Sequence, residues 1–347
     1  MSTKKIYYPN SCSIKAVLKF CADLDSSNNV EELIVDFSNM GRVEPFAMLF
    51  VARRLRTFEV DNRQVKVSYR NYETQSYVGH MGFFKSFGLD FGKKPGEACG
   101  NNTYLPLTIL RTQSIRDEAN KEWKSEQDII ERRAEELAVI LSQQKDGNLV
   151  DVFTYSIREI VRNVVEHSGS KQVAYCAQYW PAYKKVEIAI LDAGVGLKES
   201  ILQNPFVEVT CDSDAIQQVL MPAISSKNYK GAIIDTDDPW HNSGFGLYMT
   251  NRLCRNGGEF FICSGDHGIL LNDSGKLHID LGFHYEGTVV KLVLNTEKLD
   301  ELKTMLSQFQ KDGFEVAKQI KGVGVYNASA ASKMLSRDFK TTAEQGV

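Results

Sequence analysis

Residues 4–90 alternate between short apolar runs and longer segments whose apolar residues recur at helical spacing. Glu32–Phe37 is a short apolar run, and Val65–Tyr69 alternates apolar with polar positions, so each predicts a strand. Pro45–Phe58 and Tyr77–Phe87 repeat apolar residues every three or four positions, which predicts helices. Such alternation is typical of an α/β layer in which helices cover a sheet.

The pattern changes after the strand that we expect at Tyr104–Leu110. From residue 114 to 146 charged and amide side chains dominate, and the apolar residues among them recur at helical spacing, which predicts one long amphipathic helix. These apolar residues are Ile129, Ile130, Leu137, Ile140 and Leu141. The run Asp146-Gly147-Asn148 ends this helix, which we interpret as a connector between two halves.

The second half again mixes helices and strands. The elements that we expect are a helix at 149–167, strands at 172–178 and 185–191, a helix at Tyr248–Arg255, a strand at Val289–Leu294 and a helix near 297–310. The long segment 197–243 precedes the second of these helices and has its own helical stretch at Ser213–Leu220. The last residues are polar and follow no pattern, which predicts disorder.

A length of 347 residues exceeds one ordinary domain, and the patterns above divide the chain into four parts. These are an α/β domain over 1–113, a connecting helix over 114–147, a second α/β domain over 148–296, and a C-terminal helix with a polar tail over 297–347. The predicted fold class is therefore α/β, with two domains.

Composition narrows the classes of function. Hydrophobic residues make up 43% and charged residues 24%, as in globular proteins, and the net charge of -3 disfavours a large surface for nucleic acid. The N-terminal sequence lacks an apolar signal segment, and no apolar run approaches the ~20 residues that cross a bilayer, which predicts a cytoplasmic protein without membrane contact. The seven cysteines are scattered, with neither a C-x-x-C pair nor a metal-binding spacing.

The helix expected at 149–167 carries a polar row beside its apolar face. Glu159, Asn163 and His167 stand four residues apart, so they line up along one side. An amide oxygen can ligate a hard cation, and a carboxylate can take a proton from an attacking water or hydroxyl. The row therefore suits a magnesium-triphosphate site, although a solvated polar face would present the same residues.

Two further segments suit a nucleotide. The apolar strand Ile188–Leu191 ends in Asp192, and Gly194 and Gly196 follow at once. A carboxylate at a strand end could accept a hydrogen bond from the amino group of adenine, while the glycines would let a flat ring approach the backbone. The alternative is a turn capped by the aspartate itself.

A second pair of glycines opens the helix expected at Tyr248–Arg255. Asn242-Ser243-Gly244-Phe245-Gly246-Leu247 runs directly into that helix, and its bare backbone N–H groups at a helix start would favour phosphate. A glycine hinge is the alternative interpretation. Farther along, Glu286-Gly287-Thr288 precedes the strand at Val289–Leu294, where the threonine hydroxyl could reach the edge of a base.

In this order and spacing, the four segments resemble the GHKL (histidine-kinase-like) ATPase family, also called the Bergerat fold, over about 150–295. The resemblance implies a mixed sheet with helices on one face, ATP and Mg²⁺ as ligands, and an ATP lid at 197–243. It also implies a role for each motif residue. Glu159 looks like the catalytic base, Asn163 like the magnesium ligand, Asp192 like the adenine reader with Gly194 and Gly196 below the ring, Gly244, Phe245, Gly246 and Leu247 like the phosphate loop, and Thr288 like a second adenine contact.

The branch of the family is indicated by smaller features. Asn163-Val-Val-Glu-His167 resembles the N-x-x-x-H of anti-sigma-factor serine kinases and adds His167 to the implied ATP site. The helix expected at 114–146 contains no histidine, which argues against a sensor histidine kinase. In the lid, Ala223-Ile-Ser-Ser-Lys227 is similar to the T-S-K segment of mismatch-repair ATPases, so Lys227 is a candidate γ-phosphate contact beside its alternative as a solvated loop lysine.

The N-terminal half resembles the STAS domain of anti-sigma antagonists in Val35-Asp36-Phe37-Ser38 followed by Val43–Arg54. In phosphorylatable STAS domains Asp-Ser-Ser-Gly opens this helix, whereas the aligned residues here are Glu44-Pro45-Phe46-Ala47, which carry no hydroxyl. The resemblance therefore implies a docking or regulatory module that binds a protein partner and accepts no phosphate at that position.

Three functions remain open at this point. The first is a Mg²⁺-dependent ATPase that acts as a nucleotide-driven conformational switch. The second is a serine/threonine kinase of anti-sigma type acting on a separate protein. The third is a nucleotide-gated binding module that does not hydrolyse ATP. Many relatives dimerise, so the helix at 114–146 is also a candidate homodimer interface, with a packed connector as the alternative.

Overall fold

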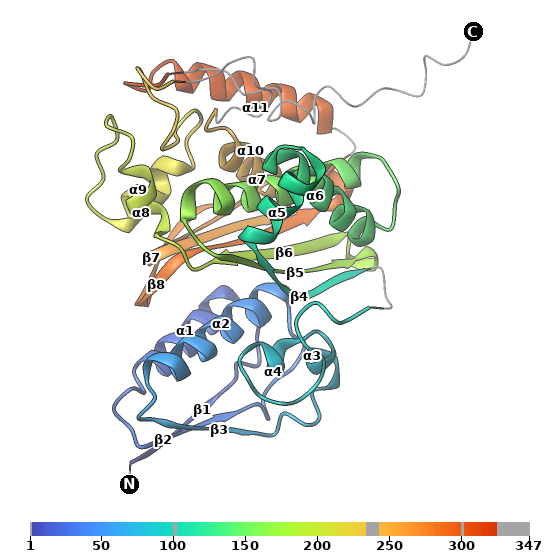
Figure 1. Ribbon diagram of the computed structural model, residues 1–347, viewed down its shortest axis with the longest axis vertical. Coiled ribbons are helices and arrows are strands. Elements are labelled where there is room, and N and C mark those ends of the chain that lie inside the picture. The colour runs from blue at the N-terminus through green and yellow to red at the C-terminus, as the bar shows by residue number, and fades with distance from the viewer. Residues whose placement is uncertain (1, 100–102, 234–242, 300–301, 325–347) are drawn as a thin grey trace.

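The computed structural model describes residues 2–99, 103–233, 243–299 and 302–324. It is a mixed α/β structure with a parallel sheet of three strands and an antiparallel sheet of five. The sheets lie at different levels, with helices between them and further helices above the larger sheet (Figure 1). The predicted α/β fold class is confirmed.

The smaller, amino-terminal sheet has the order β1-β2-β3, and neighbouring strands are parallel. The elements of this unit are β1 (Thr3–Tyr7), α1 (Ile14–Asp25), β2 (Glu32–Asp36), α2 (Pro45–Asp61), β3 (Lys66–Arg70), α3 (Ser76–His80) and α4 (Phe83–Ser86). Helices join the strands because a parallel pair needs a crossover connection. The helix expected over 77–87 is split at Gly82, which has a φ of 90°.

The larger sheet has the order β4-β5-β6-β8-β7. Its strands are β4 (Tyr104–Arg111), β5 (Gln172–Trp180), β6 (Lys185–Asp192), β7 (Glu259–Asn272) and β8 (Gly275–Asn295). Every neighbouring pair is antiparallel, which corrects the mixed sheet implied by the family resemblance. Hairpins account for part of this, since β5 joins β6 through a 3-10 turn (Pro181–Tyr183) and β7 joins β8 through a turn at 273–274.

The strand β4 belongs to the larger sheet, although its place in the sequence groups it with the amino-terminal half. Its residue Ile109 pairs with Ala174 of β5, and Arg111 pairs with Gln172. If the units are defined by strand pairing, the first unit ends before Tyr104, whereas the sequence pattern placed its end at residue 113.

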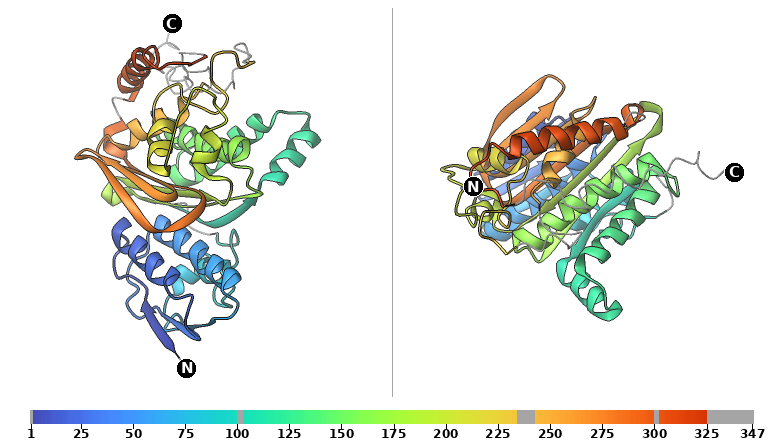
Figure 2. Two further views of the ribbon diagram at one scale, coloured as in Figure 1. Left: turned by 90° about the vertical axis from the view of Figure 1, so that its left-hand side faces the viewer. Right: turned by 90° about the horizontal axis from the view of Figure 1, so that it is seen from above.

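Two helices, α5 (Thr112–Glu122) and α6 (Glu126–Ser142), replace the single long helix expected over 114–146. The break is at Trp123, whose left-handed backbone (φ 56°) ends α5. Ser125 then opens α6 with a capping box, in which Ser125 and Asp128 each accept a hydrogen bond from the other's backbone N–H. The two helices project from the side of the molecule in both views of Figure 2.

Helices cover both faces of the larger sheet. On one face lie α7 (Asn148–Asn163), the π-helical turn that continues it (Val164–Ser168), and α10 (Gly246–Cys254). On the other face lie α1 and α2, which pack against β8 and against β5 and β6 (Figure 1). The resemblance implies helices on one face only. The second face is covered as well because its aromatic residues pack on α2, as in the pairs Phe46–Phe261 and Phe50–Tyr285 with ring centroids 5.4 and 5.3 Å apart.

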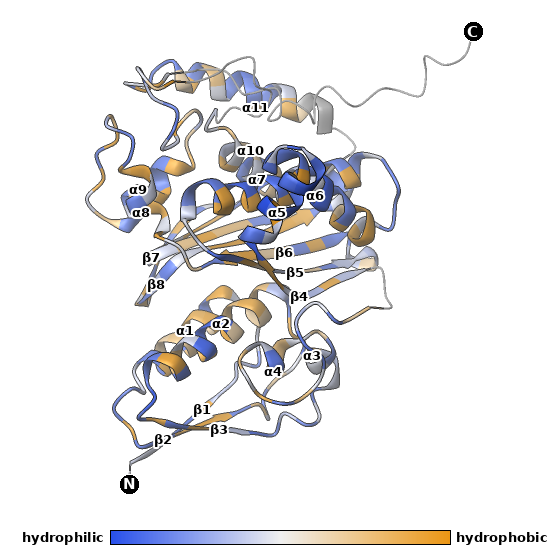
Figure 3. Ribbon diagram, in the orientation of Figure 1, coloured by the Kyte–Doolittle hydropathy of each residue, from blue (hydrophilic) through white to orange (hydrophobic). Residues whose placement is uncertain are grey.

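Two extended cores hold these layers together. One lies between the larger sheet and α6, α7 and α10. The other contains buried residues of β1, β2, α1 and α2 together with residues of β5, β6, β7 and β8, so both sheets contribute to it. Figure 3 shows the concentration of apolar residues on α1 and α2, in contrast to the largely polar α5 and α6.

The described part of the expected lid carries α8 (Gly196–Ile201) and α9 (Asp212–Val219), both packed near β7. The helix expected at Ser213–Leu220 is therefore present, with bounds shifted by one residue. A short 3-10 helix (Thr296–Leu299) and α11 (Leu302–Ala317) follow the larger sheet, and α11 contacts α10. The expected disordered tail lies outside the described residues. Across the described ranges, every helix is too short or too polar to traverse a bilayer.

Candidate functional site

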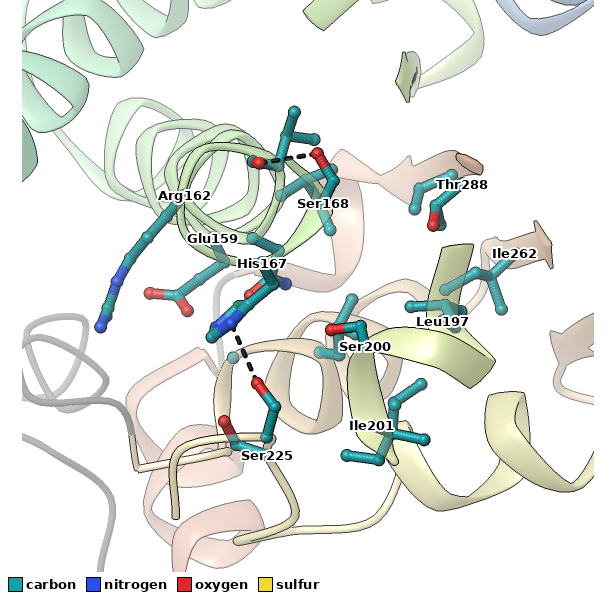
Figure 4. A pocket seen from close by; sticks show the side chains of 18 of the residues that line it. Glu159, Arg162, His167, Ser168, Leu197, Ser200, Ile201, Ser225, Ile262 and Thr288 are labelled. Carbon is teal, nitrogen blue, oxygen red and sulfur yellow. Dashed lines mark hydrogen bonds between the residues drawn. The ribbon is translucent and has the colours of Figure 1, made fainter. Parts of the chain in front are cut away.

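A cavity lies between the end of α7, the start of α10, α8 and the larger sheet. The space between its walls is about 930 Å³, a volume that includes open solvent. Figure 4 shows Glu159, Arg162 and His167 on one side of the cavity, and Ile262 and Thr288 on the other. The cavity thus has a charged side and a more apolar side.

Nine of the residues singled out by sequence line this one cavity. They are Glu159, Asn163, His167, Asp192, Gly196, Gly244, Gly246, Leu247 and Thr288. They come from four separate segments, namely α7 with its π turn, the end of β6 with the start of α8, the start of α10, and β8. The fold therefore brings together side chains that are far apart in the sequence.

Three predicted residues lie elsewhere. Gly194 has the space of its missing side chain filled by the backbone of Ser168, so it is required for packing of the loop. Phe245 is 1% exposed and belongs to the core. Lys227 is 54% exposed at its side chain, and its ammonium lies 3.9 Å from a carboxylate oxygen of Glu166.

The charged side begins with a buried ion-pair network on α7. Arg158 is 2% exposed, and its guanidinium donates to Glu159 Oε1 at 2.7 Å and to Glu131 Oε2 at 3.0 Å. The second oxygen of Glu159, Oε2, lies beside Gly246 at the start of α10. The carboxylate is thus fixed by Arg158 on one side and faces the amino-terminal end of a helix on the other, a position that favours a negative charge.

The π turn continues the charged side and meets the lid. Arg162 donates to Glu166 Oε1 at 2.6 Å, and Ser226 Oγ lies 3.1 Å from His167 Nδ1. Burial lowers the pKa of His167 to about 4, with Lys227 and Arg162 adding to the effect against Glu166, so the ring is neutral at pH 7. Burial also opposes the charge of Glu166, but Arg162 outweighs it and the pKa of Glu166 is lowered. π turns of this kind are frequent at functional sites.

The apolar side surrounds a second carboxylate. Asp192 Oδ1 accepts a hydrogen bond of 2.7 Å from the backbone of Gly194, and the Tyr285 hydroxyl donates to the Asp192 carbonyl at 2.8 Å. Burial raises the pKa of Asp192 to about 6, despite hydrogen bonds that favour its ionised form. Apolar side chains of the sheet and of α8 form the surrounding wall, namely Ile190, Leu197, Ile201, Ile262 and Val290.

Two glycines at the start of α10 allow neighbouring atoms to approach the backbone closely. Gly244 has a φ of 72°, and a Cβ there would collide with the Ala223–Ile224 peptide of the lid. A Cβ on Gly246 would overlap the carboxylate of Glu159. Because a side chain at either position would collide with its neighbours, glycine lets the helix start lie directly at the cavity.

Sequence reasoning missed several residues that line the cavity. Arg162 is the most informative, because it precedes Asn163 and brings a second guanidinium to the charged side. Its position in the helix was the available signal. The lid residues Ile224, Ser225 and Ser226 lie in the segment compared with mismatch-repair ATPases, in which only Lys227 was taken as a candidate contact.

The residues present fit a magnesium-bound nucleoside triphosphate. The apolar side with the Asp192 carboxylate offers a place for a base, whereas Arg162 and the start of α10 offer cation and N–H groups to phosphates. Asn163 has the amide oxygen that could complete the coordination of Mg²⁺. Among the described residues, no cluster of three or more His, Cys, Asp and Glu side chains is arranged to hold a metal by itself. In comparisons with family models, curated proteins and solved structures, nothing matches this chain.

Proposed function

We propose that the chain is an ATPase of the GHKL type that binds Mg²⁺-ATP in this cavity and acts as a nucleotide-driven switch. One observation carries the proposal: Glu159 with Asn163, Asp192 and Gly244, taken from three different motifs, line the same cavity. Three motifs that are separate in the sequence would not be expected to converge in this way. A perturbed carboxyl within a large, partly apolar cavity adds support.

The cavity gives each part of ATP a chemically suitable environment. Asp192 would accept a hydrogen bond from the amino group of adenine, with Thr288 nearby, and the apolar side would cover the ring. Arg162 and the N–H groups at the start of α10 would hold the phosphates. Magnesium held by Asn163 would neutralise part of the phosphate charge.

In the hydrolysis reaction, Glu159 is the general base that accepts a proton from water. As a water oxygen forms its bond to the γ-phosphorus and the bridging oxygen leaves with ADP, the water proton passes to the Glu159 carboxylate. Arg158 engages Oε1, so Oε2 is the oxygen that faces the phosphate end. Holding one oxygen in place orients the other without any movement of the helix.

A switch needs a contact that differs between nucleotide states. The lid already touches the charged side of the cavity, through Ser226 on His167 and Lys227 near Glu166. Three residues after Lys227, Lys230 donates its backbone N–H to the carbonyl of Gly322, beyond α11. A rearrangement of the lid around the γ-phosphate would therefore be transmitted both to α7 and to the carboxyl-terminal segment.

The decisive experiment compares Glu159→Gln with Glu131→Gln. Both substitutions remove one carboxylate from Arg158, but only Glu159 reaches the cavity. We expect phosphate release from ATP to fall by about 10²-fold or more in Glu159→Gln and to change little in Glu131→Gln, with ATP binding retained in both. Equal turnover in the two variants would remove the assignment of Glu159 as base.

A serine/threonine kinase is the second candidate, favoured by His167 lining the cavity four residues after Asn163, as in anti-sigma kinases. The same residues would then transfer phosphate to a hydroxyl of another protein. Incubation with γ-labelled ATP and cell extract separates the two reactions, because a labelled protein band is expected only for the kinase. Unhydrolysed nucleotide that stays bound through purification would instead favour a binding module.

A further inference from the structure

A second cavity lies on the opposite side of the larger sheet, between α2 and the ends of β4, β5 and β6. The space between its walls is about 730 Å³, a volume that includes open solvent. Its floor is apolar and includes Leu49, Leu107, Ile109, Ala174 and Leu191. This space therefore lies between the amino-terminal unit and the larger sheet, and it shares Leu191 and Asp192 with the proposed nucleotide cavity.

Strand alternation directs the side chains of β6 into two different cores. In β6, Ile188 and Ile190 belong to the core on the α7 side, whereas Ala189 and Leu191 belong to the core on the α2 side. Asp192 follows the first set, and its carboxylate bonds to Gly194 beside the nucleotide cavity. It borders the second cavity at the edge of the strand, and the remaining lining residues carry no acid.

The charge of the second cavity comes from two arginines of α2. Arg53 and Arg56 are three residues apart, so they share one side of the helix, and both line the cavity. Arg53 is half-buried and Arg56 is exposed, and neither guanidinium has a hydrogen bond or ion pair to any described residue, although the charge of Arg53 acts to lower the pKa of Asp192. Their neighbour Arg54 differs, since it is buried and bonds to Asp25 at 2.6 Å. The polar groups of Ser86 and Gln172 also reach the cavity wall.

We propose that this second cavity binds a small ligand that carries an oxyanion, a phosphate ester or a carboxylate, on an apolar body. Arg53 and Arg56 would grip the oxyanion by charge-assisted hydrogen bonds, for which the planar guanidinium is well suited. The apolar floor would cover the body of the ligand, in the usual arrangement of a pocket with a few convergent polar groups.

Three probes that share one ring test this chemistry on the full chain by isothermal titration calorimetry. Phenyl phosphate and benzoate present the two kinds of oxyanion, and benzyl alcohol presents the same ring without charge. We expect at least one of the two anions to bind and benzyl alcohol to show no binding. The anion that binds identifies the source of the charge. Binding of benzyl alcohol as tightly as the anions would overturn the proposal, and so would the absence of binding by both anions.

Variants locate the binding. The double variant Arg53→Gln and Arg56→Gln should weaken binding by roughly tenfold or more, because each charge-assisted hydrogen bond contributes at least about 1.4 kcal/mol. Arg63→Gln removes the same charge from an exposed position just beyond α2 and should bind like the wild type. If the double variant keeps its affinity while Arg162→Gln loses it, the anion lies in the nucleotide cavity and the proposal is overturned. Both arginines lie outside the core, and an unchanged unfolding midpoint verifies that the variants fold.

Discussion

The carboxylate of Glu159 occupies the space that a side chain on Gly246 would fill, at the first turn of α10. Glu159 supplies the carboxylate, and the absence of a side chain at Gly246 leaves the space that it occupies. The helix α7 and the glycine loop that opens α10 are therefore physically interdependent, which their separate positions in the sequence do not show. A change at either residue would alter the charged side of the cavity.

The first prediction concerns that contact. Gly246→Ala should displace Glu159 or the start of α10, so we expect ATP turnover to fall strongly and the free energy of unfolding to drop by about 1–3 kcal/mol. Phosphate-release assays and urea unfolding measure the two effects. Gly41→Ala is the matched control, because a Cβ there meets only one atom at an ordinary 3.5 Å. Wild-type turnover in Gly246→Ala would contradict the arrangement.

The second prediction is that nucleotide stabilises the fold. A ligand that binds only the folded state raises the free energy of unfolding by about 2.7 kcal/mol at a hundredfold excess over its dissociation constant. We expect Mg²⁺-ATP to raise the thermal unfolding midpoint of the wild type. Asp192→Asn should weaken the shift, because its side chain no longer accepts hydrogen bonds at both oxygens. No shift with ATP, ADP or a non-hydrolysable analogue would count against the proposed function.

The third prediction concerns pH, because Asp192 and His167 affect stability in opposite senses. The raised pKa of Asp192, about 6, means that folding takes up a proton between about pH 4 and 6, so this group lowers stability as pH rises. The lowered pKa of His167, about 4, means that folding excludes a proton between about pH 4 and 6.5, so this group raises stability as pH rises.

Substitution should separate these two effects. Asp192→Asn should make stability rise more steeply with pH between 4 and 6, and His167→Gln should make it rise less steeply, each by up to roughly 1.4 kcal/mol per pH unit. Urea unfolding across this range measures the slopes, and the exposed Asp61→Asn should leave them unchanged. Slopes that move in the same direction in both variants would show that the cavity does not hold these groups as described.

The fourth prediction concerns the junction between the two units. Glu187 of β6 is fully buried, accepts a 2.9 Å hydrogen bond from the backbone of Phe46 at the start of α2, and lies 3.7 Å from Lys291. Burial raises the pKa of Glu187 to about 7 even with Lys291 nearby. Lys291→Met should therefore destabilise the fold by up to about 3–5 kcal/mol above pH 7, where the charged Glu187 would keep only Lys185, 3.7 Å away, as a cationic neighbour.

The loss should shrink below pH 7 as Glu187 takes up a proton. Denaturant unfolding at pH 5 and pH 8 measures the difference, with Lys171→Met as a control because Lys171 is exposed and its side chain has no partner among the described residues. An equal loss at both pH values would show that Glu187 does not depend on Lys291 for its charge.

The fifth prediction concerns Lys227. Its side chain is 54% exposed and pairs loosely with Glu166, so Lys227→Gln should cost less than about 1 kcal/mol of stability. We also expect the preference for ATP over ADP to be unchanged, since Lys227 does not line the cavity. Titration of both nucleotides checks this. A selective loss of ATP affinity would instead make Lys227 a γ-phosphate contact in a closed lid.

Local pattern was sufficient to predict most of the elements. The strands at 172–178 and 185–191 and the lid helix appear with small shifts, because burial on one or both faces leaves a clear periodicity. The polar row of Glu159, Asn163 and His167 was also visible, since a helix repeats its faces every three to four residues.

Other features depend on distant residues or on uncommon conformations. The pairing of β4 with β5 is a long-range contact that no local pattern encodes. Trp123 ends α5 in a left-handed conformation that tryptophan rarely adopts. The sequence therefore has no helix-stop signal at this position, and the pattern predicts one continuous helix. The ion pair between Arg158 and Glu159 joins adjacent residues, whose side chains usually point apart on a helix. Arg158 also pairs with Glu131 of α6, a contact between distant residues that the local pattern does not reveal.

The helices α1 and α2 bury apolar residues against both sheets at once. Removing either half would expose a large apolar surface on the other. We therefore expect the chain to unfold in a single calorimetric transition, and neither half to fold stably alone. A recombinant domain that contains the larger sheet would have to include α1 and α2. The boundary expected from the sequence at residue 113 is therefore unsuitable for dividing the protein.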